Sequence, residues 1–131
     1  MAAKKPLTPL ELEIMNVLWA RGEANVQTVQ AALPRELAYT TVQTMLNILA
    51  RKGRVKRTKR ERAFFYKAVV SRDQVAQKAV RDMVQRLFGG SPESLVMTLL
   101  ESRDLTPQKL DRLRRMVAGA QQKEEDRHGK N

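Results

Sequence analysis

The sequence of 131 residues contains no cysteine, so disulfide bonds, thiolate metal sites and cysteine nucleophiles are excluded. Histidine is almost absent too: the sequence has one, His128, which lies in a polar C-terminal stretch. The chain also lacks a glycine-rich loop of the kind that cradles phosphates in nucleotide-binding enzymes. With these groups missing, we expect a protein that is not an enzyme and that binds no metal ion or cofactor.

Long apolar runs are missing as well. No stretch approaches the ~20 consecutive apolar residues that a membrane span needs. Residues 1–6 include two lysines, but no long apolar segment follows them as it would in a secretory signal. We therefore expect a cytoplasmic protein without membrane insertion. Hydrophobic residues make up 42% of the chain, which is enough for one domain or for two small domains that share a core.

Acidic residues are scarce in one part of the chain. Overall, 25 basic and 14 acidic residues give a net charge of +11. Residues 1–50 hold four of each sign, residues 71–131 hold twelve bases and nine acids, and residues 51–70 hold nine bases and one acid, a local charge of +8. An ordinary solvated surface mixes the two signs. A block of one sign is typical of a surface that binds a polyanion such as nucleic acid.

Three short helices are predicted in the first half of the chain, at about 8–21, 26–33 and 39–52. The first begins with Thr8-Pro9-Leu10-Glu11, which has the pattern of a capping box with proline in the first turn. The short segment 23–25 between the first two helices is suited to a brief strand.

The helix at 39–52 has an unusual polar face. At 100° per residue its apolar side chains fall on one side, and short, uncharged, hydrogen-bonding side chains fall on the other. A solvated helix face is usually rich in Glu and Lys instead. Gln, Asn and Thr can hydrogen-bond base edges in the major groove of DNA. We therefore predict base readout by Thr40, Thr41, Gln43, Thr44 and Asn47.

Two strands are predicted next, at 54–59 and 62–69, joined by a charged hairpin tip. This order of helices and hairpin matches a winged helix-turn-helix, in which the third helix enters the major groove and the hairpin lies over the backbone. The cations here are the predicted phosphate and wing contacts: Arg51, Lys52, Arg54, Lys56, Arg57, Lys59, Arg60 and Arg62. For Arg60 and Arg62 the alternatives are a phosphate and the minor groove. Trp19, Phe64 and Tyr66 are expected in the core.

The rest of the chain is predicted to be helical, at 71–88, 91–102 and 107–118, with a polar, frayed tail at 123–131. These helices have apolar faces. A core of about fifty residues is marginal alone, so a two-fold dimer is favoured over an intramolecular core. The predicted dimer contacts are Val80, Met83, Val84, Leu87, Phe88, Leu95, Val96, Leu99, Leu100, Leu110, Leu113, Met116 and Val117.

The predicted fold class is thus mainly α with a small β-hairpin. An N-terminal winged helix-turn-helix (1–70) is followed by a three-helix C-terminal dimerisation region (71–122).

Four segments carry a family resemblance. The run Leu37-Ala38-Tyr39-Thr40-Thr41-Val42-Gln43-Thr44-Met45-Leu46-Asn47 resembles the recognition helix of the penicillinase-repressor family, which includes the methicillin-resistance repressors. Residues 12–19, 62–66 and 87–96 are similar to that family's first helix, wing strand and C-terminal signature. The resemblance covers about residues 7–120, with its motifs in the family's order.

The resemblance implies a dimeric transcriptional repressor that binds an inverted-repeat operator. It places Thr40, Thr41, Gln43 and Thr44 at DNA-facing positions of the recognition helix. Members often carry arginine where this chain has Ile48, so one polar contact is missing here. Copper-responsive relatives use a C-terminal cysteine pair, and copper sensing by that route is excluded.

The resemblance also implies a route of release. In the resistance systems a membrane sensor with a metallopeptidase domain triggers cleavage of the repressor in the helix after the glycine pair. The corresponding bond here is Thr98–Leu99, where those repressors carry an Asn-Phe type of pair. A membrane sensor metallopeptidase is thus one expected partner, beside double-stranded DNA and a second copy of the chain.

The function predicted from the sequence is therefore a homodimeric, sequence-specific DNA-binding repressor of an inverted-repeat operator, relieved by a sensor-linked signal such as proteolysis in the C-terminal region. The alternative is a non-specific DNA- or RNA-binding protein. Its marker would be aromatic side chains exposed for stacking on bases.

Overall fold

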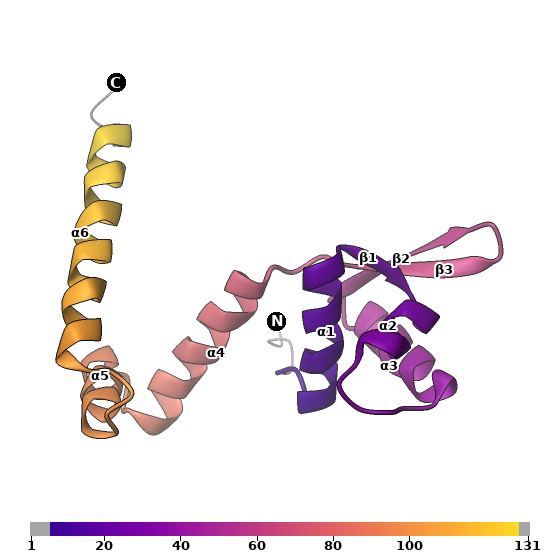
Figure 1. The fold of residues 1–131 in the computed structure, drawn as a ribbon, viewed down its shortest axis with the longest axis horizontal. Coiled ribbons are helices and arrows are strands. Elements are labelled where there is room, and N and C mark those ends of the chain that lie inside the picture. The colour runs from indigo at the N-terminus through magenta and orange to yellow at the C-terminus, as the bar shows by residue number, and fades with distance from the viewer. Residues whose placement is uncertain (1–5, 129–131) are drawn as a thin grey trace. The chain divides into compact units, whose positions relative to one another are not determined.

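The computed structural model describes the backbone of residues 6–128 and the side chains of residues 6–126. Within these residues six helices and three strands follow one another in the order α1, β1, α2, α3, β2, β3, α4, α5, α6 (Figure 1). The predicted fold class, mainly helical with a small β-hairpin, is confirmed. The chain divides into two compact units, one ending at Val80 and one beginning at Arg81.

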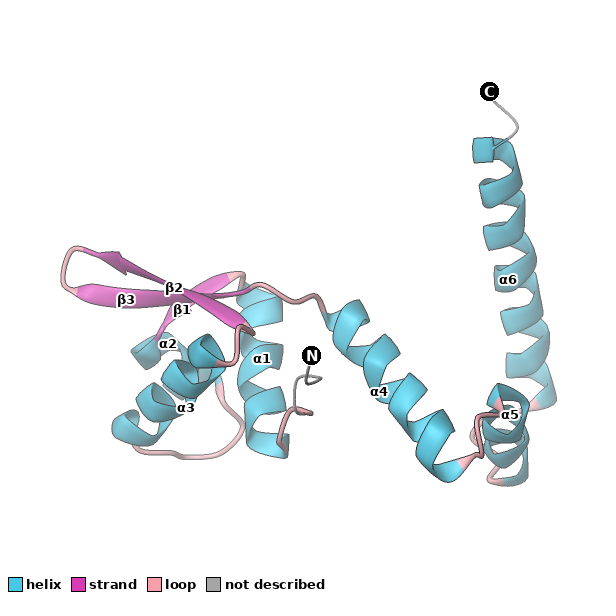
Figure 2. Cartoon of the chain, turned by 180° about the vertical axis from the view of Figure 1, so that it is seen from behind, coloured by secondary structure: helices cyan, strands magenta, loops and turns pink. Residues whose placement is uncertain are grey.

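The first unit has a small sheet on one side of three helices (Figure 2). The sheet is antiparallel, in the order β1-β3-β2, with Ala24 and Arg57 both paired with Tyr66 of the central strand. The brief strand expected at 23–25 is therefore confirmed. The elements are α1 (Pro9–Arg21), β1 (Glu23–Asn25), α2 (Val26–Ala32), α3 (Tyr39–Arg51), β2 (Val55–Arg60) and β3 (Ala63–Ala68).

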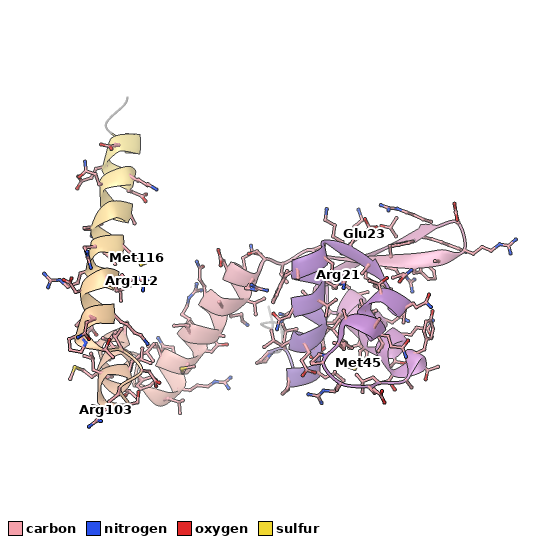
Figure 3. The ribbon with its side chains drawn as sticks, in the orientation of Figure 1. Arg21, Glu23, Met45, Arg103, Arg112 and Met116 are labelled. Atoms are coloured by element: carbon pink, nitrogen blue, oxygen red, sulfur yellow. The ribbon has the colours of Figure 1, made fainter. Side chains whose placement is uncertain are left out.

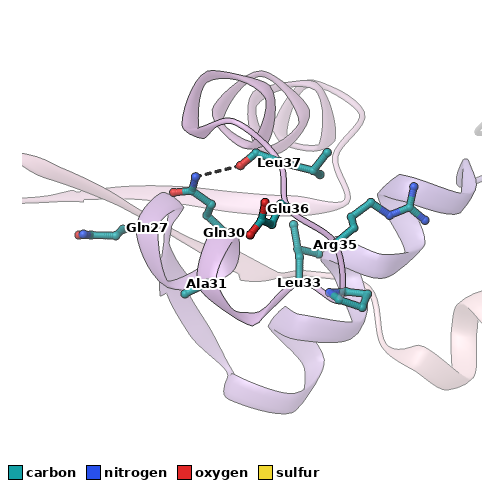
Figure 4. A pocket seen from close by; sticks show the side chains of 8 residues that line it. Gln27, Gln30, Ala31, Leu33, Arg35, Glu36 and Leu37 are labelled. Carbon is teal, nitrogen blue, oxygen red and sulfur yellow. Dashed lines mark hydrogen bonds between the residues drawn. The ribbon is translucent and has the colours of Figure 1, made fainter.

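Local hydrogen bonds set where these helices begin. The predicted capping box is present, since Glu11 N donates to Thr8 Oγ1 and Thr8 N donates to Glu11 Oε1 (3.2 and 2.8 Å). The turn into α3 is held by Gln30, whose side-chain Nε2 donates to the carbonyl of Leu37 at 2.9 Å (Figure 4). This turn borders a shallow surface hollow of about 640 Å³. The start of the polar helix is thereby tied to α2.

One apolar core holds the sheet and the helices together. Its fully buried side chains come from every layer and include Ile14, Leu18, Val29, Leu46 and Tyr66. Because the apolar side of α3 is buried in this core, the opposite side must face outward. Packing thus decides which residues of α3 can meet a ligand.

Trp19 joins the end of the sheet to α1. Its indole Nε1 donates to the carbonyl of Val70 at 2.9 Å, and the guanidinium of Arg72 lies 5.4 Å from the centre of its ring. Trp19 is half-buried and packs against the core, as expected. Phe64, also expected in the core, is instead 37% exposed. It lines an open hollow beside the hairpin, where the guanidinium of Arg57 lies against its ring in place of the core.

A buried ion pair connects the beginning of α1 to the end of α3. The carboxylate of Glu11 is 1% exposed and lies 2.8 Å from Lys52 Nζ. Burial works to raise the pKa of Glu11, but hydrogen bonds from Lys52 and from Thr8 outweigh it and hold this pKa below its ordinary value of 4.5. A depressed pKa in the folded state contributes stability above the unfolded value. That stability is lost as the pH falls through the folded value.

The substitution Glu11→Gln is expected to lower the free energy of unfolding by about 1–2 kcal/mol at neutral pH, because the charged hydrogen bond to Lys52 is lost. The gap between the two proteins should shrink as the pH falls below 4.5. Urea unfolding of both at about pH 7 and about pH 3 measures it. A gap that stays the same at both values would show that the ionised carboxylate contributes nothing.

The second unit contains the C-terminal part of α4 (Arg72–Leu87), then α5 (Pro92–Glu101) and α6 (Pro107–His128). Gly89 and Gly90 both have positive φ (56° and 83°), a conformation that glycine adopts without strain, and they separate α4 from α5. None of the helices within residues 6–128 is both long enough and apolar enough to cross a membrane.

The frayed tail expected at 123–131 is partly wrong. The last helix continues to His128, ten residues past the predicted end at 118. Within this tail, residues 129–131 and the side chains of Arg127 and His128 lie outside the part of the chain that the structure describes. Residues 120–126 are mostly Ala, Gln, Lys and Glu, which favour a helix even without an apolar face. The lack of apolar periodicity concealed this extension.

Candidate nucleic-acid interface

The polar face of α3 is exposed as predicted from its periodicity. Val42, Leu46 and Leu49 are buried, and the helix turns the other side outward. Four of the predicted base-reading residues lie on this outward side and are exposed: Thr40, Thr41, Gln43 and Thr44. The arrangement offers hydroxyl and amide groups along one helix, without a competing charge in its first three turns. Ile48 is half-buried beside them.

Asn47 is placed differently from these four. It is half-buried, and its Oδ1 accepts hydrogen bonds from the hydroxyl of Tyr66 at 2.9 Å and from Arg57 Nη1 at 3.2 Å. Burial raises the pKa of Tyr66, so its hydroxyl stays protonated and remains a donor. The oxygen that a bidentate contact with adenine would use is already occupied within the protein.

Most of the predicted phosphate contacts are exposed around the end of α3 and along the hairpin. The hairpin, built from β2 and β3, projects past the helices of its unit (Figure 1). Six cations are exposed there: Arg51, Lys56, Arg57, Lys59, Arg60 and Arg62. A projecting hairpin lined with cations is suited to a phosphate backbone, since long basic side chains can reach it from either side of the strands.

Two predicted phosphate contacts are built into the fold instead. Arg54 is only 5% exposed, and its backbone N and O bond to Leu49 and Val69 at 3.0 Å each, at the start of the hairpin. Lys52 pairs with the buried Glu11. Lys52 and Arg54 flank Gly53 in the turn that follows α3. The ammonium of Lys52 is held by the carboxylate of Glu11 and the side chain of Arg54 is buried, so both contribute to the packing of the first unit.

The two faces of the hairpin hold their cations differently. Arg57 and Lys59 pair in register with Tyr66 and Phe64, and the guanidinium of Arg57 lies 4.2 Å from the centre of the Phe64 ring. On the other face, Arg60 pairs with Glu23 of β1 at 3.0 Å. Glu23 is labelled at the strand that borders α1 in Figure 3. These pairs could not be predicted from the sequence, because strands of six residues show too little alternation to fix their register with one another.

A hollow of about 330 Å³ lies between α3 and the hairpin. Tyr39 and Gln43 line it from α3, and Arg62 and Phe64 line it from the hairpin. Neither aromatic ring was singled out from the sequence as an exposed residue at the interface. Its lining combines aromatic rings, which can stack on sugars and bases, with the guanidinium of Arg62, which can meet a phosphate.

In the second unit the predicted dimer contacts are mostly uncovered within one chain. Val84 is buried, whereas no residue of α5 or of the described part of α6 is. Leu87 is 74% exposed and Met116 is 64% exposed, and Figure 3 shows Met116 projecting from α6. The bond Thr98–Leu99 lies inside α5, where Thr98 Oγ1 donates to the carbonyl of Ser94 at 3.0 Å. Among the described residues no three acidic or histidine side chains gather as metal ligands would.

An exposed hydrogen-bonding helix beside a cationic hairpin defines a winged-helix, DNA-binding type of protein. The model of the penicillinase repressor family matches residues 7–119, and the chain belongs to that family. It is accordingly a transcriptional repressor and not an enzyme. The family resemblance read from the sequence is thereby confirmed.

Individual relatives agree with this assignment. The chain is 37% identical over 122 residues to the transcriptional regulator BlaI of Mycobacterium tuberculosis, covering 90% of this chain and 87% of that one. It is 27% identical to a penicillinase repressor of Staphylococcus aureus, over 79% of this chain and 84% of the other. It is 24% identical to the methicillin resistance regulatory protein MecI of Mammaliicoccus sciuri, over 85% of this chain and 92% of that one.

Among solved structures, a MarR family protein from Bacillus stearothermophilus is similar with a TM-score of 0.47 and 23% identity, covering 77% of this chain and 74% of that one.

Proposed function

We propose that this repressor is a homodimer that binds an inverted-repeat operator and reads its sequence through α3. The observation that carries the proposal is the neutral, exposed face of Thr40, Thr41, Gln43 and Thr44 beside a cationic hairpin. Phosphate contacts supply affinity for any duplex, and contacts to base edges supply discrimination. Because the two kinds of side chain lie on neighbouring elements, one docking geometry serves both.

Dimer formation is supported by the apolar side chains left exposed on α4, α5 and α6. A second copy related by a two-fold axis would cover the same face on both chains. The same axis would present two recognition helices to two half-sites in opposite orientation, which is the symmetry of an inverted repeat. We expect the operator to be occupied in the cytoplasm, where it would exclude transcription of the gene behind it.

Release of the repressor is proposed to follow from damage to the dimer region. Cleavage of Thr98–Leu99 by a protease linked to a membrane sensor would remove α6 from the chain. Because this bond lies within a hydrogen-bonded helix, cleavage requires α5 to unwind first. A chain that ends at Thr98 is therefore expected to be monomeric and to bind the operator at least about 10²-fold more weakly, since the second half-site no longer benefits from linkage. A truncated chain that still dimerises would contradict this route.

In vitro selection from a random DNA library, with the full chain as bait, tests the proposed function. The expected product is an inverted repeat with the same half-site in both orientations. The relatives are named for penicillinase and methicillin resistance, so promoters of antibiotic-resistance genes are the first natural sequences to compare with the product. Recovery of unrelated sequences without a shared motif would overturn it.

Non-specific binding of nucleic acid is the second candidate, and one observation favours it. Phe64 is exposed next to cations, an arrangement that stacks on bases of single strands. Tighter binding of single-stranded DNA or RNA than of any duplex, in direct competition at equal salt, would support this candidate and contradict the first.

A further inference from the structure

Arg57 is the hairpin cation that hydrogen-bonds a side chain of α3. Its Nη1 donates to Asn47 Oδ1 at 3.2 Å, and its guanidinium stacks 4.2 Å from the centre of the Phe64 ring. The guanidinium carries five donors in one plane, and the hydrogen bond to Asn47 uses only one nitrogen. Arg57 is exposed, so it keeps donors that can meet a phosphate.

Asn47 is anchored in turn by the core. The hydroxyl of the buried Tyr66 donates to the same Oδ1 at 2.9 Å, and Tyr66 pairs in register with Arg57 across the two strands. The chain of contacts therefore runs from the core through Tyr66 to Asn47 and on to Arg57. It fixes the position of one hairpin cation relative to the base-reading face of α3.

We propose that Asn47 is a positioning residue, and that Arg57, held by it, is the phosphate contact that sets the register between the recognition helix and the wing. This inference rests on the proposed operator binding. The DNA strand would pass between α3 and the hairpin, over the hollow that Gln43 and Phe64 line, and Arg57 would clamp one of its phosphates. An arginine that is already ordered loses less side-chain entropy on binding than a mobile one.

The role differs from base readout in a measurable way. If Asn47 acts through Arg57, removing it weakens operator binding without changing which base is preferred at any position. Removing Asn47 from a protein that already lacks Arg57 should then have no further effect. If Asn47 reads a base, its loss relaxes the preference at one base pair, and the two losses add.

The experiment is a double-mutant cycle with Asn47→Ala, Arg57→Ala and the double variant. The probes are the duplex recovered by selection with the unmodified protein and a scrambled duplex of the same composition. Arg57→Ala is expected to weaken binding to the selected duplex roughly tenfold. It should also lower the salt slope, which is the steepness with which the logarithm of the binding constant falls with the logarithm of the salt concentration, by about one unit for each protomer. Asn47→Ala is expected to weaken it severalfold, and the double variant to match Arg57→Ala. Additive losses, or a changed base preference in Asn47→Ala, would overturn the positioning role.

Two further variants separate positioning from stability. Tyr66→Phe keeps the ring in the core but removes the hydroxyl that anchors Asn47, so it is expected to weaken operator binding by no more than Asn47→Ala does and to leave the base preference unchanged. Asn47→Leu keeps the volume if Asn47→Ala unfolds. Thermal unfolding of each variant checks that it is folded at the assay temperature. Equal affinity of the unmodified protein for both duplexes would overturn the proposed function itself. If the unmodified protein prefers the selected duplex but the losses of affinity in Asn47→Ala and Arg57→Ala add up in the double variant, only this inference is overturned.

Discussion

The double substitution Leu113→Glu and Met116→Glu is expected to turn the dimer into a monomer and to weaken operator binding by about 10²- to 10⁴-fold. Both side chains are exposed on α6 in the single chain, Met116 by 64% of its surface. In a dimer they would be buried against the partner, where an unpaired carboxylate is strongly unfavourable. A monomer binds one half-site and loses the linkage to the second.

The control changes the charge of the same helix by the same amount. Ala118→Glu and Gln122→Glu place two carboxylates on the side of α6 turned away from Leu113 and Met116, and both positions are exposed. This control is expected to remain dimeric. Equilibrium sedimentation gives the molecular mass and a gel shift gives the affinity. Loss of DNA binding in both double variants alike would assign the effect to charge repulsion from DNA and not to the dimer.

Gln43→Ala is expected to reduce the discrimination between the operator and a single-mismatch duplex by about 1–3 kcal/mol. Gln43 is exposed on α3 and lines the hollow between this helix and the hairpin. Its amide can donate and accept at one base edge, a pattern that alanine cannot reproduce. Binding to unrelated duplex should change little, because Gln43 carries no charge.

Lys56→Ala is the matched comparison on the hairpin. Lys56 is exposed on β2, and its loss should weaken all duplexes alike and lower the salt slope by about one unit for each protomer. Titrations of both variants against operator and mismatch at several salt concentrations separate the two effects. If Lys56→Ala weakened binding to the operator but not to the mismatched duplex, and the salt slope stayed unchanged, the division between base readout and phosphate contact would be wrong.

The sequence predicted the first unit well because its signals are local. The capping box at Thr8, the apolar side of α3 and the alternation of β3 each depend on neighbouring residues. Buried Tyr66 and exposed Gln43 followed from these periods directly. The block of charge likewise located the hairpin as the basic surface.

What the sequence could not predict depends on contacts between distant residues. Lys52 looks like any surface cation until the fold brings Glu11 beside it. Asn47 carries an amide of the kind that reads bases, and only its contact with the hydroxyl of Tyr66 shows that its side-chain oxygen is occupied. Phe64 alternates in phase with Tyr66, yet it lines an open hollow and stays 37% exposed. Periodicity gives the side of a strand but not what covers it.

The central claim is that α3 reads sequence while the hairpin holds phosphates. Competition between the selected inverted repeat and a scrambled duplex of equal length and composition, at the same salt concentration, tests it most directly. The account predicts that the inverted repeat binds at least about 10³-fold more tightly. Equal affinity for the two duplexes would contradict it, because the charge of +8 in residues 51–70 would then account for all of the binding.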